Sequence, residues 1–264
     1  MRRLILRAAC FLMLGAAVPS LSAHYNMLLP DKSSLKKGES VTFTCQWGHP
    51  FEHELFDAPK PEGLLVVAPD GTKCDLLKTI TKTSVPAGES KKVTAYQFRF
   101  TAELRGDYIF LLTVPPIWME DEQEFYQDTV KVVLHVQAQK HWDAAAGGEF
   151  ELRPLTRPYG LTDGMILQAQ CRAGGKPLEN ALVEIERYHP SPPKLLPPDE
   201  HITRTAKTDP NGVVTATLTE PGWWCLTAQR DGGGREHEGK KYHVRQRSTF
   251  WVHVDDKSVS SSGK

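Results

Sequence analysis

The sequence consists largely of short segments in which apolar and polar residues alternate, and this period of two restricts the folds open to it. Val41, Phe43, Cys45 and Trp47, for example, alternate with polar neighbours. Such alternation is typical of a β-strand with one buried face, whereas no long stretch keeps the period of an amphipathic helix. The pattern predicts an all-β fold.

Turn sequences rich in glycine and proline separate the alternating segments. Several short strands at this spacing are typical of an Ig-like β-sandwich. The segment Asp209 to Gly212 predicts a hairpin turn, because Asp209 can close an Asx turn and Gly212 adopts positive φ readily. The remaining predicted strands are residues 93–100, 107–114, 129–136, 165–171, 182–188, 203–208, 213–218, 223–229 and 249–254.

The distribution of these segments predicts two tandem sandwich domains that follow a signal peptide. The N-terminal domain is expected at residues 24–138 and the C-terminal domain at residues 149–255. Residues 139–148 interrupt the strand pattern and predict a linker. The Ser-rich residues 256–264 predict a disordered tail.

The first 23 residues match a secretory signal peptide, with arginines at the start, a short apolar run and small residues before Ala23. Cleavage after Ala23 would make His24 the mature N-terminus and place the protein in the periplasm or outside the cell. No later segment is apolar enough to span a membrane. Loss of three arginines leaves 29 Lys and Arg against 32 Asp and Glu, a balance that does not favour a nucleic-acid partner.

Cleavage would also remove Cys10 and leave Cys45, Cys74, Cys171 and Cys225. An even number of cysteines in an exported chain favours disulfides. The pairing Cys45–Cys74 with Cys171–Cys225 is preferred, because each bond then stays within one predicted domain. Buried free thiols are the alternative.

The C-terminal half resembles the prealbumin-like or carboxypeptidase-regulatory type of β-sandwich. The resemblance rests on a turn that enters a strand, an Asp-Pro-Asn-Gly turn and a Pro-Gly corner. These features lie at Gly175 to Val183, Lys207 to Gly212 and Glu220 to Trp224.

Five stretches together resemble the periplasmic proteins of nickel or cobalt uptake, a family much of which is described as a domain of unknown function. The stretches are His24 to Pro30, Gly48 to Glu52, Pro154 to Gly160, Thr208 to Gly212 and Gly222 to Trp224. The resemblance covers nearly the whole mature chain. It implies two β-sandwich domains and delivery of Ni(II) or Co(II) to a membrane transporter.

A metal site is predicted around the mature N-terminus. A terminal His24 would offer its α-amine and its ring nitrogen to one ion, and such nitrogen donors suit Ni(II), Co(II) and Cu(II). His49 is the first further candidate, because it lies in a segment that carries the family resemblance. Glu52 and His53 follow closely, and Pro50 indicates that they lie on a loop.

Other functions remain open from the sequence. The tryptophans could form a platform in a binding module for carbohydrate or protein that uses no metal, and a terminal histidine also fits a copper chaperone. Enzyme motifs such as Gly-x-Ser-x-Gly, a phosphate-binding glycine loop or His-Glu-x-x-His are absent from the sequence. The sequence therefore favours a binding protein over an enzyme.

Overall fold

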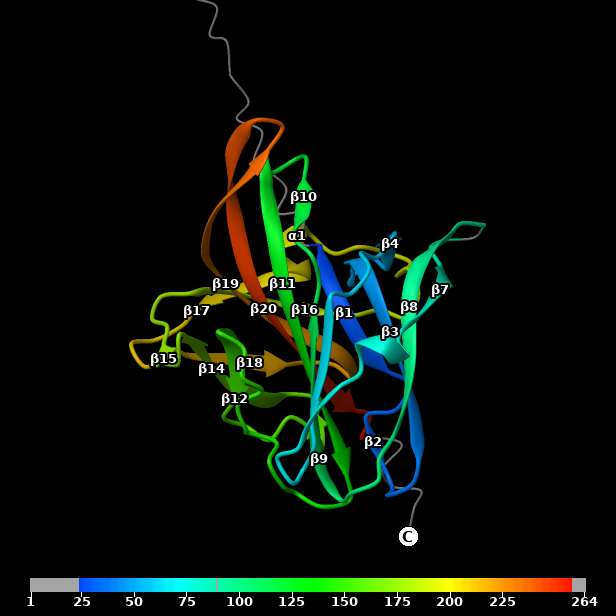
Figure 1. Cartoon of the computed structure of the whole chain (residues 1–264). Helices are drawn as coiled ribbons and strands as arrows, with labels where there is room; N and C mark the ends of the chain where they lie inside the picture. The colour runs from blue at the N-terminus through cyan, green and yellow to red at the C-terminus, as the bar shows by residue number, and fades with distance from the viewer. Residues whose placement is uncertain (1–23, 89, 258–264) are drawn as a thin grey trace, which may run out of the picture.

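The computed structural model describes residues 24–88 and 90–257, and almost all of its regular structure is β-strand (Figure 1). The first half contains β1 (Tyr25–Pro30), β2 (Ser34–Leu35), β3 (Ser40–His49), β4 (Glu54–Phe56), β5 (Gly63–Val67), β6 (Lys73–Asp75), η1 (Leu77–Thr79), β7 (Thr81–Pro86), β8 (Lys92–Thr101), β9 (Gly106–Thr113), β10 (Ile117–Met119) and β11 (Glu124–Val136). The second half contains β12 (Phe150–Pro154), β13 (Leu161–Thr162), β14 (Met165–Ala173), β15 (Lys176–Pro177), β16 (Leu182–Arg187), α1 (Asp199–Ile202), β17 (Arg204–Lys207), β18 (Val213–Leu218), β19 (Gly222–His237) and β20 (Lys240–Asp255).

The strands form three sheets. A central sheet of 11 strands has the main order β17-β16-β19-β20-β11-β9-β5-β6, and β2, β10 and β13 attach at its sides. A five-stranded sheet contains β1, β3, β4, β7 and β8, and a four-stranded sheet contains β12, β14, β15 and β18. The all-β, Ig-like sandwich class predicted from the sequence is confirmed.

The central sheet contributes to two hydrophobic cores. On β20, Trp251 belongs to the core beneath the β1-β3-β8 sheet, whereas Phe250 and Val252 belong to the core beneath the β12-β14-β18 sheet. On β11, Val132 belongs to the first of these cores and Val133 to the second. Successive side chains of a strand point to opposite faces, so the central strands bury apolar residues on both sides.

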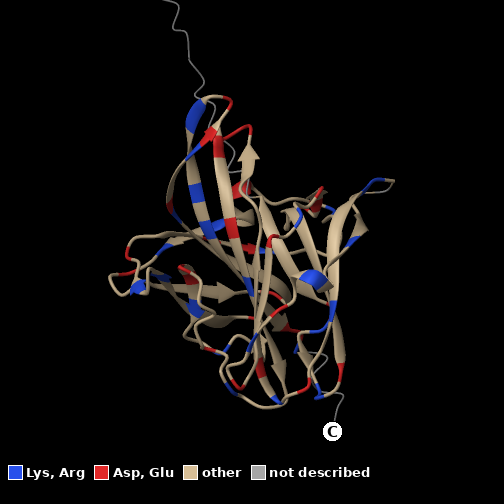
Figure 2. Ribbon diagram, viewed as in Figure 1, with Lys and Arg blue, Asp and Glu red and all other residues tan. Residues whose placement is uncertain are grey.

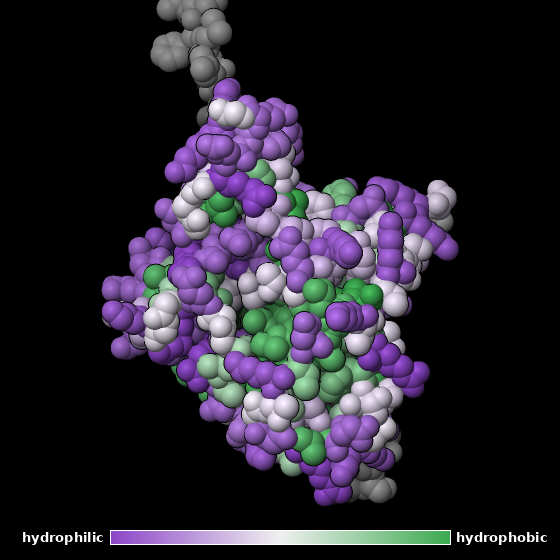
Figure 3. Space-filling view, viewed as in Figure 1, coloured by the Kyte–Doolittle hydropathy of each residue, from purple (hydrophilic) through white to green (hydrophobic). Residues whose placement is uncertain are grey.

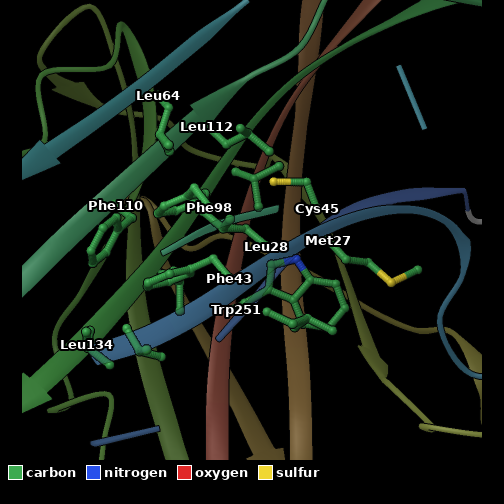
Figure 4. Close-up of a cluster of buried hydrophobic side chains, with 14 of the residues drawn as sticks. Met27, Leu28, Phe43, Cys45, Leu64, Phe98, Phe110, Leu112, Leu134 and Trp251 are labelled. Carbon is green, nitrogen blue, oxygen red and sulfur yellow. The ribbon is translucent and has the colours of Figure 1, made fainter. Parts of the chain in front are cut away.

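The first core is rich in aromatic and branched side chains (Figure 4). Phe43 lies against Phe98 and Phe110 with ring-centroid distances of 4.7 and 4.4 Å. Trp251 reaches this core from β20 and is completely buried. A strand of the second half therefore completes the core of the first half.

The two halves are also joined by parallel pairing of β11 with β20, from Phe125 opposite Val244 to Val132 opposite Trp251. Buried Arg247 on β20 forms an ion pair with buried Asp128 on β11, at 2.6 Å. Figure 2 shows basic residues along the β20 arm beside acidic residues on β11. The predicted domain boundaries at residues 138 and 149 stay a prediction, and the intervening residues 139–148 form no helix or strand.

The predicted Asp209 to Gly212 turn forms, but the hairpin expected around it is wrong. Asp209 accepts hydrogen bonds from the backbone N–H groups of Asn211 and Val213, at 2.9 and 2.7 Å. β17 pairs with β16 in the central sheet, while β18 pairs with β14 in the four-stranded sheet. The turn therefore carries the chain from one sheet to the next.

The predicted disulfides are also wrong, because all four cysteines in the described residues are free thiols. Cys45 is buried on β3, whereas Cys74 is exposed on β6 in a different sheet. Cys171 lies in the second core and Cys225 in the first, on opposite faces of the central sheet. Desolvation by burial raises the pKa of Cys45 and of Cys171 to about 12.

Hydrophobic residues also gather in the middle of one face of the molecule, within a polar surround (Figure 3). The large hydrophobic side chains that are most exposed are Leu104, Leu155, Met165, Ile166, Leu195 and Leu196. Two of these, Leu195 and Leu196, lie in the proline-rich segment that precedes α1. The predicted signal peptide at residues 1–23 and most of the predicted tail lie outside the described residues.

Candidate metal site

His24 and His49 are brought together by the antiparallel pairing of β1 with β3. Tyr25 lies opposite Gly48 and Asn26 opposite Trp47, so the same register places His24 opposite His49. Residues directly opposite each other in an antiparallel pair have Cβ atoms about 4.5–5.5 Å apart. The two histidines, which are 25 positions apart in the sequence, are thus cross-strand neighbours.

The rings of these two histidines are in contact. Their centroids lie 4.3 Å apart and the planes meet at 67°, so one ring faces the edge of the other. Trp47 stacks on His24 at a centroid distance of 5.3 Å, and Phe56 lies at 5.3 Å from His24 and 5.6 Å from His49. The pair is therefore enclosed by aromatic rings that limit its contact with water.

Phe56 reaches the site because β4 folds back on β3 after a short turn. Gly48 permits this close approach. A Cβ at position 48 would overlap the backbone carbonyl oxygen of Glu54 and lie 2.9 Å from the Cα of Leu55. Gly48 also has a φ of +148°, a conformation that side-chain-bearing residues rarely adopt.

Glu54 is a member of the site that the sequence did not single out. It lies opposite His49 in the β3–β4 pair, and its Oε2 is 3.3 Å from Nδ1 of His49. A carboxylate on one ring nitrogen orients a histidine and makes its other nitrogen a better ligand. The signal in the sequence was the four-residue turn after His49, which places residue 54 across from residue 49.

His53 and Glu52, both predicted ligands, point elsewhere. The turn that contains them confirms the loop indicated by Pro50. Nδ1 of His53 donates to the backbone carbonyl of His189 at 2.8 Å, and burial lowers the pKa of His53. The negative charge of Glu52 contributes to the raised pKa of buried Glu186. As far as the structure describes contacts, His24 and His49 are brought together, and His53 and Glu52 are not placed with them.

A buried carboxyl group lies beneath this turn. Glu186 is 1% exposed and accepts hydrogen bonds from the backbone N–H of Phe51 at 3.2 Å and the hydroxyl of Thr203 at 2.5 Å. Desolvation raises the pKa of Glu186 to about 8, against the lowering effect of the Thr203 hydrogen bond. The carboxyl group is therefore mainly protonated at neutral pH.

Trp47 provides a further polar atom at the site. Its indole N–H is buried and has no hydrogen-bond acceptor among the described residues. Leaving such a donor without an acceptor costs about 1–3 kcal/mol. A water molecule or ligand atom next to Trp47 would therefore be stabilised.

β1 is fixed in place by contacts with the central sheet. The side-chain amide of Asn26 donates to Asp128 at 2.7 Å, and the indole N–H of Trp251 donates to the backbone carbonyl of Asn26 at 3.1 Å. The hydroxyl of Tyr25 donates to Glu184 at 3.0 Å. The strand that begins immediately after His24 is thus held by buried contacts, which limits the positions open to His24.

The described side chains alone supply two imidazoles to the site. Over residues 24–88 and 90–257, no three His, Cys, Asp or Glu side chains lie where they could hold one metal ion together. The α-amine of His24, which exists only after cleavage at Ala23, would be a third nitrogen donor. Cleavage after Ala23 would therefore raise the number of nitrogen donors at this place from two to three.

Comparisons with known proteins were made for the whole chain. A family model described as "Domain of unknown function (DUF4198)" matches residues 21–232. No curated protein matches the chain. In the described part of the chain, no helix combines the length and the apolar character needed to cross a membrane.

Several solved structures are similar to the chain at low identity. One is a DUF4785 family protein from Legionella pneumophila, with 12% identity and a TM-score of 0.31. The match covers 79% of this chain and 53% of that one, so this chain spans about half its length. The D0–D1 domain of intimin has 14% identity and a TM-score of 0.19, covering 86% and 99% of the two chains. A two-domain fibronectin type III segment of chicken tenascin has 9% identity and a TM-score of 0.23, covering 87% and 100%.

Proposed function

Because the chain belongs to the DUF4198 family, a family of domains of unknown function, we propose a function from its own geometry. The processed protein binds a divalent transition-metal ion through His24 and His49 outside the cytoplasm. It delivers this ion, Ni(II) or Co(II), to a membrane transporter. The protein acts as a binding protein and not as an enzyme.

The observation that carries this proposal is the contact between the two histidine rings, whose centroids are 4.3 Å apart. Two imidazoles bound at right angles to one ion would have centres about 4.4 Å apart, for a metal–nitrogen bond of about 2.0 Å. The observed spacing therefore suits neighbouring positions around one ion. The cross-strand position of the two histidines in the β1–β3 pair holds their rings at that spacing.

The α-amine of His24 completes the donor set. The amine and the ring of one terminal histidine can bind the same ion, and His49 adds a second ring. Three nitrogen donors with positions left for water suit the tetragonal geometry of Ni(II) and Cu(II). An exchangeable water position is also useful in a carrier, because an incoming ligand of the receiving protein can attack there.

The surroundings of the pair support binding of a cation. Glu54 lies 3.3 Å from Nδ1 of His49 and adds negative charge beside the ion. The aromatic rings of Trp47 and Phe56 exclude water from one side. The Trp47 N–H, which has no acceptor among the described residues, would find one in a water molecule bound to the ion.

Isothermal titration of the exported protein tests the site. Mass spectrometry first establishes that the chain begins at His24, and Ni(II), Co(II), Cu(II) and Zn(II) are then titrated separately. A second preparation carries one additional alanine before His24, and a third carries His49→Ala. Binding of one ion per chain is expected, with a loss of roughly 100-fold or more in affinity for both altered proteins.

His201→Ala serves as the matched control, because His201 is an exposed histidine on α1. Its affinity should equal that of the unaltered protein. Absence of binding by the protein that begins at His24 would overturn the metal proposal. Equal affinity with and without the added alanine would show that the α-amine is not a ligand. A strong preference for Cu(II) over Ni(II) and Co(II) would replace the proposed delivery of nickel or cobalt with delivery of copper.

The delivery step is tested in cells of the organism that encodes the protein. A strain that lacks this gene should accumulate less radioactive nickel or cobalt at limiting external concentrations. The unaltered gene should restore uptake, whereas the His49→Ala gene should not. Restoration by both genes would show that the site takes no part in uptake.

A further inference from the structure

A second site lies at the opposite end of β1 from His24, beside the segment Pro154 to Gly160. A pocket of about 270 Å³ opens here between β2, β11, the start of β19 and the end of β20. β1 has six residues, so the pocket is separated from His24 by roughly 20 Å along the strand. The pocket therefore belongs to a different part of the molecule from the candidate metal site.

Strand pairing assembles the pocket from distant parts of the sequence. Ser34 lies opposite His135 where β2 pairs with β11, and Trp223 lies opposite His253 where β19 pairs with β20. β13, which follows Gly160 directly, pairs with the end of β20. Residues from both halves of the chain thus line one pocket.

One wall of the pocket is fixed by a completely buried carboxylate, Asp107. It accepts hydrogen bonds from the backbone N–H of Lys140 at 2.7 Å and from the hydroxyl of Tyr159 at 3.0 Å, and it lies 2.7 Å from Nδ1 of His135. The rings of His135 and Tyr159 stack at 3.9 Å. Since Nδ1 faces Asp107, the other ring nitrogen of His135 points away from it, on the side that lines the pocket.

Arg157 supplies the strongest hydrogen-bond donors in the lining. Its guanidinium lies over the ring of Tyr159 at 5.1 Å, and its Nε donates to the backbone carbonyl of Tyr159 at 3.2 Å. A Cβ at position 160 would lie only 3.2 Å from Nη2 of Arg157, so Gly160 leaves room for the guanidinium. Among the described residues no carboxylate forms an ion pair with Arg157.

The opposite wall supplies an acceptor and an apolar face. The carboxylate of Asp255 lies 3.1 Å from Nδ1 of His253, and the ring of His253 meets Trp223 edge-on at 5.1 Å. Asp255 and Trp223 both line the pocket. The pocket therefore has a cationic donor group at Arg157, an anionic acceptor group at Asp255 and aromatic surfaces between them.

We infer that this pocket binds a small organic acid that carries both a carboxylate and a hydrogen-bond donor, as amino acids and hydroxy acids do. Arg157 binds the carboxylate with two parallel hydrogen bonds, the geometry that a guanidinium favours. Nδ1–H of His135 donates to Asp107, so its other ring nitrogen accepts a hydrogen bond from the amino or hydroxyl group of the ligand, as Asp255 does. Trp223 and Tyr159 flank the carbon skeleton.

The lining argues against two other classes of ligand. Inorganic phosphate and other compact dianions would bring their second charge towards Asp255, which like-charge repulsion disfavours. A neutral sugar could bond to Asp255 but would leave the guanidinium of Arg157 without an anion. One carboxylate with a donor group nearby satisfies both ends of the pocket.

A thermal-shift panel of the twenty common L-amino acids and of lactate, malate and phenyllactate, each at 10 mM, tests the inference. The full processed protein is used with a chelator present, so that a failure of the metal site does not affect the result. Ligands that raise the melting temperature are then titrated by calorimetry. L-alanine and L-lactate have the same carbon skeleton but carry an amino group and a hydroxyl group, respectively. Comparing the affinities of such pairs shows which of the two donor groups the pocket prefers.

Two comparisons establish the mode of binding. Replacing the carboxylate of the best ligand by its amide should abolish binding, and Arg157→Gln should weaken the acid by roughly tenfold or more, because it removes a charge-assisted pair. Arg99→Gln is the matched control, since Arg99 is an exposed arginine on β8, and should bind normally. The unliganded melting temperature of each variant shows whether it is folded.

The inference would be overturned if no member of the panel raised the melting temperature. Equal binding of the acid and its amide would also overturn it, as would an unchanged affinity in folded Arg157→Gln. If folded Arg157→Gln binds normally but His135→Gln does not, the carboxylate lies elsewhere in the pocket and the assignment of Arg157 is wrong.

Discussion

The two sites use the same pair of groups, a histidine whose Nδ1 lies near a carboxylate, but in different surroundings. At the candidate metal site, Glu54 lies 3.3 Å from His49 and its side chain is 59% exposed. At the pocket, Asp107 lies 2.7 Å from His135 and is completely buried. An exposed carboxylate adjusts to its histidine at little cost, whereas a buried one with three neighbours fixes the histidine before any ligand arrives.

The buried carboxyl groups beneath the two sites differ as well. Asp107 receives hydrogen bonds from a backbone N–H and a tyrosine hydroxyl and faces a histidine. Glu186, beneath the turn that follows His49, lies near other acidic groups and has a raised pKa of about 8 because of desolvation. The pocket is therefore preorganised, while the region beneath the metal site responds to pH.

The largest effect is expected from Asp107→Ala. The change leaves the N–H of Lys140 and the hydroxyl of Tyr159 without their acceptor and opens a space beside His135. We expect the free energy of unfolding to fall by about 3 kcal/mol, measured by urea denaturation. A loss below about 1 kcal/mol would show that Asp107 does not hold the pocket together.

Gly48→Ala tests how far the metal site depends on the close approach of β4 to β3. A Cβ at position 48 would overlap the backbone of Glu54, so β4 must move and carry Phe56 away from the histidines. We expect a loss of about 2 kcal/mol in unfolding free energy, together with weaker metal binding. Gly38→Ala is the control, because Gly38 also has positive φ but no atom within 4 Å of an added Cβ. If both variants lost the same unfolding free energy, backbone strain alone would explain the effect of Gly48→Ala, without a contribution from the β3–β4 contact.

Glu186→Gln is expected to change the pH dependence of stability. The unfolded chain releases this proton near pH 4.3, whereas the folded chain keeps it up to about pH 8. The contribution of Glu186 is therefore full below about pH 4.3 and is lost as the pH rises towards 8. Between pH 5 and pH 7 the unaltered protein should lose on the order of 2 kcal/mol relative to Glu186→Gln, and the loss should continue to grow up to about pH 8.

Urea denaturation at pH 5, 7 and 8.5 measures this difference, with Glu103→Gln at an exposed position as the control. Parallel pH profiles of the unaltered protein and Glu186→Gln would contradict the raised pKa.

Glu54→Gln should have the smallest effect on stability. Glu54 is largely exposed, and ion pairs at such positions contribute about 0–1 kcal/mol. Its expected effect is on function, because loss of the carboxylate beside His49 should weaken metal binding by roughly tenfold. Calorimetry and urea denaturation of the same preparation separate the two readouts. A large loss of stability without a loss of affinity would assign Glu54 to the fold and not to the site.

Parts of the candidate site could be predicted from the sequence, and other parts could not. His24 and His49 were chosen for their donor chemistry and for the segments that contain them, and the structure places their rings in contact. His53 was chosen for its proximity in sequence, but a positive φ of 55° at this residue turns the chain, and its ring bonds to the carbonyl of His189. Sequence proximity does not show which way a turn directs a side chain.

The second pocket is not predicted by the sequence. His135 and His253 lie within the predicted strands 129–136 and 249–254. Each has a carboxylate partner, Asp107 and Asp255, but the meeting of β2, β11, β19 and β20 at one end of the central sheet has no local signal. The disulfide prediction failed for the same reason, because Cys171 and Cys225 face opposite sides of that sheet.

The sequence by itself determined which segments become strands and where a turn such as Asp209 to Gly212 closes. These properties depend on neighbours within a few positions, through alternating burial and local hydrogen bonds. The tertiary structure alone decided which strands pair, which face of the central sheet each core occupies, and that His24 lies beside His49. Those outcomes depend on the packing free energy of many distant segments together, so no single segment of the sequence contains them.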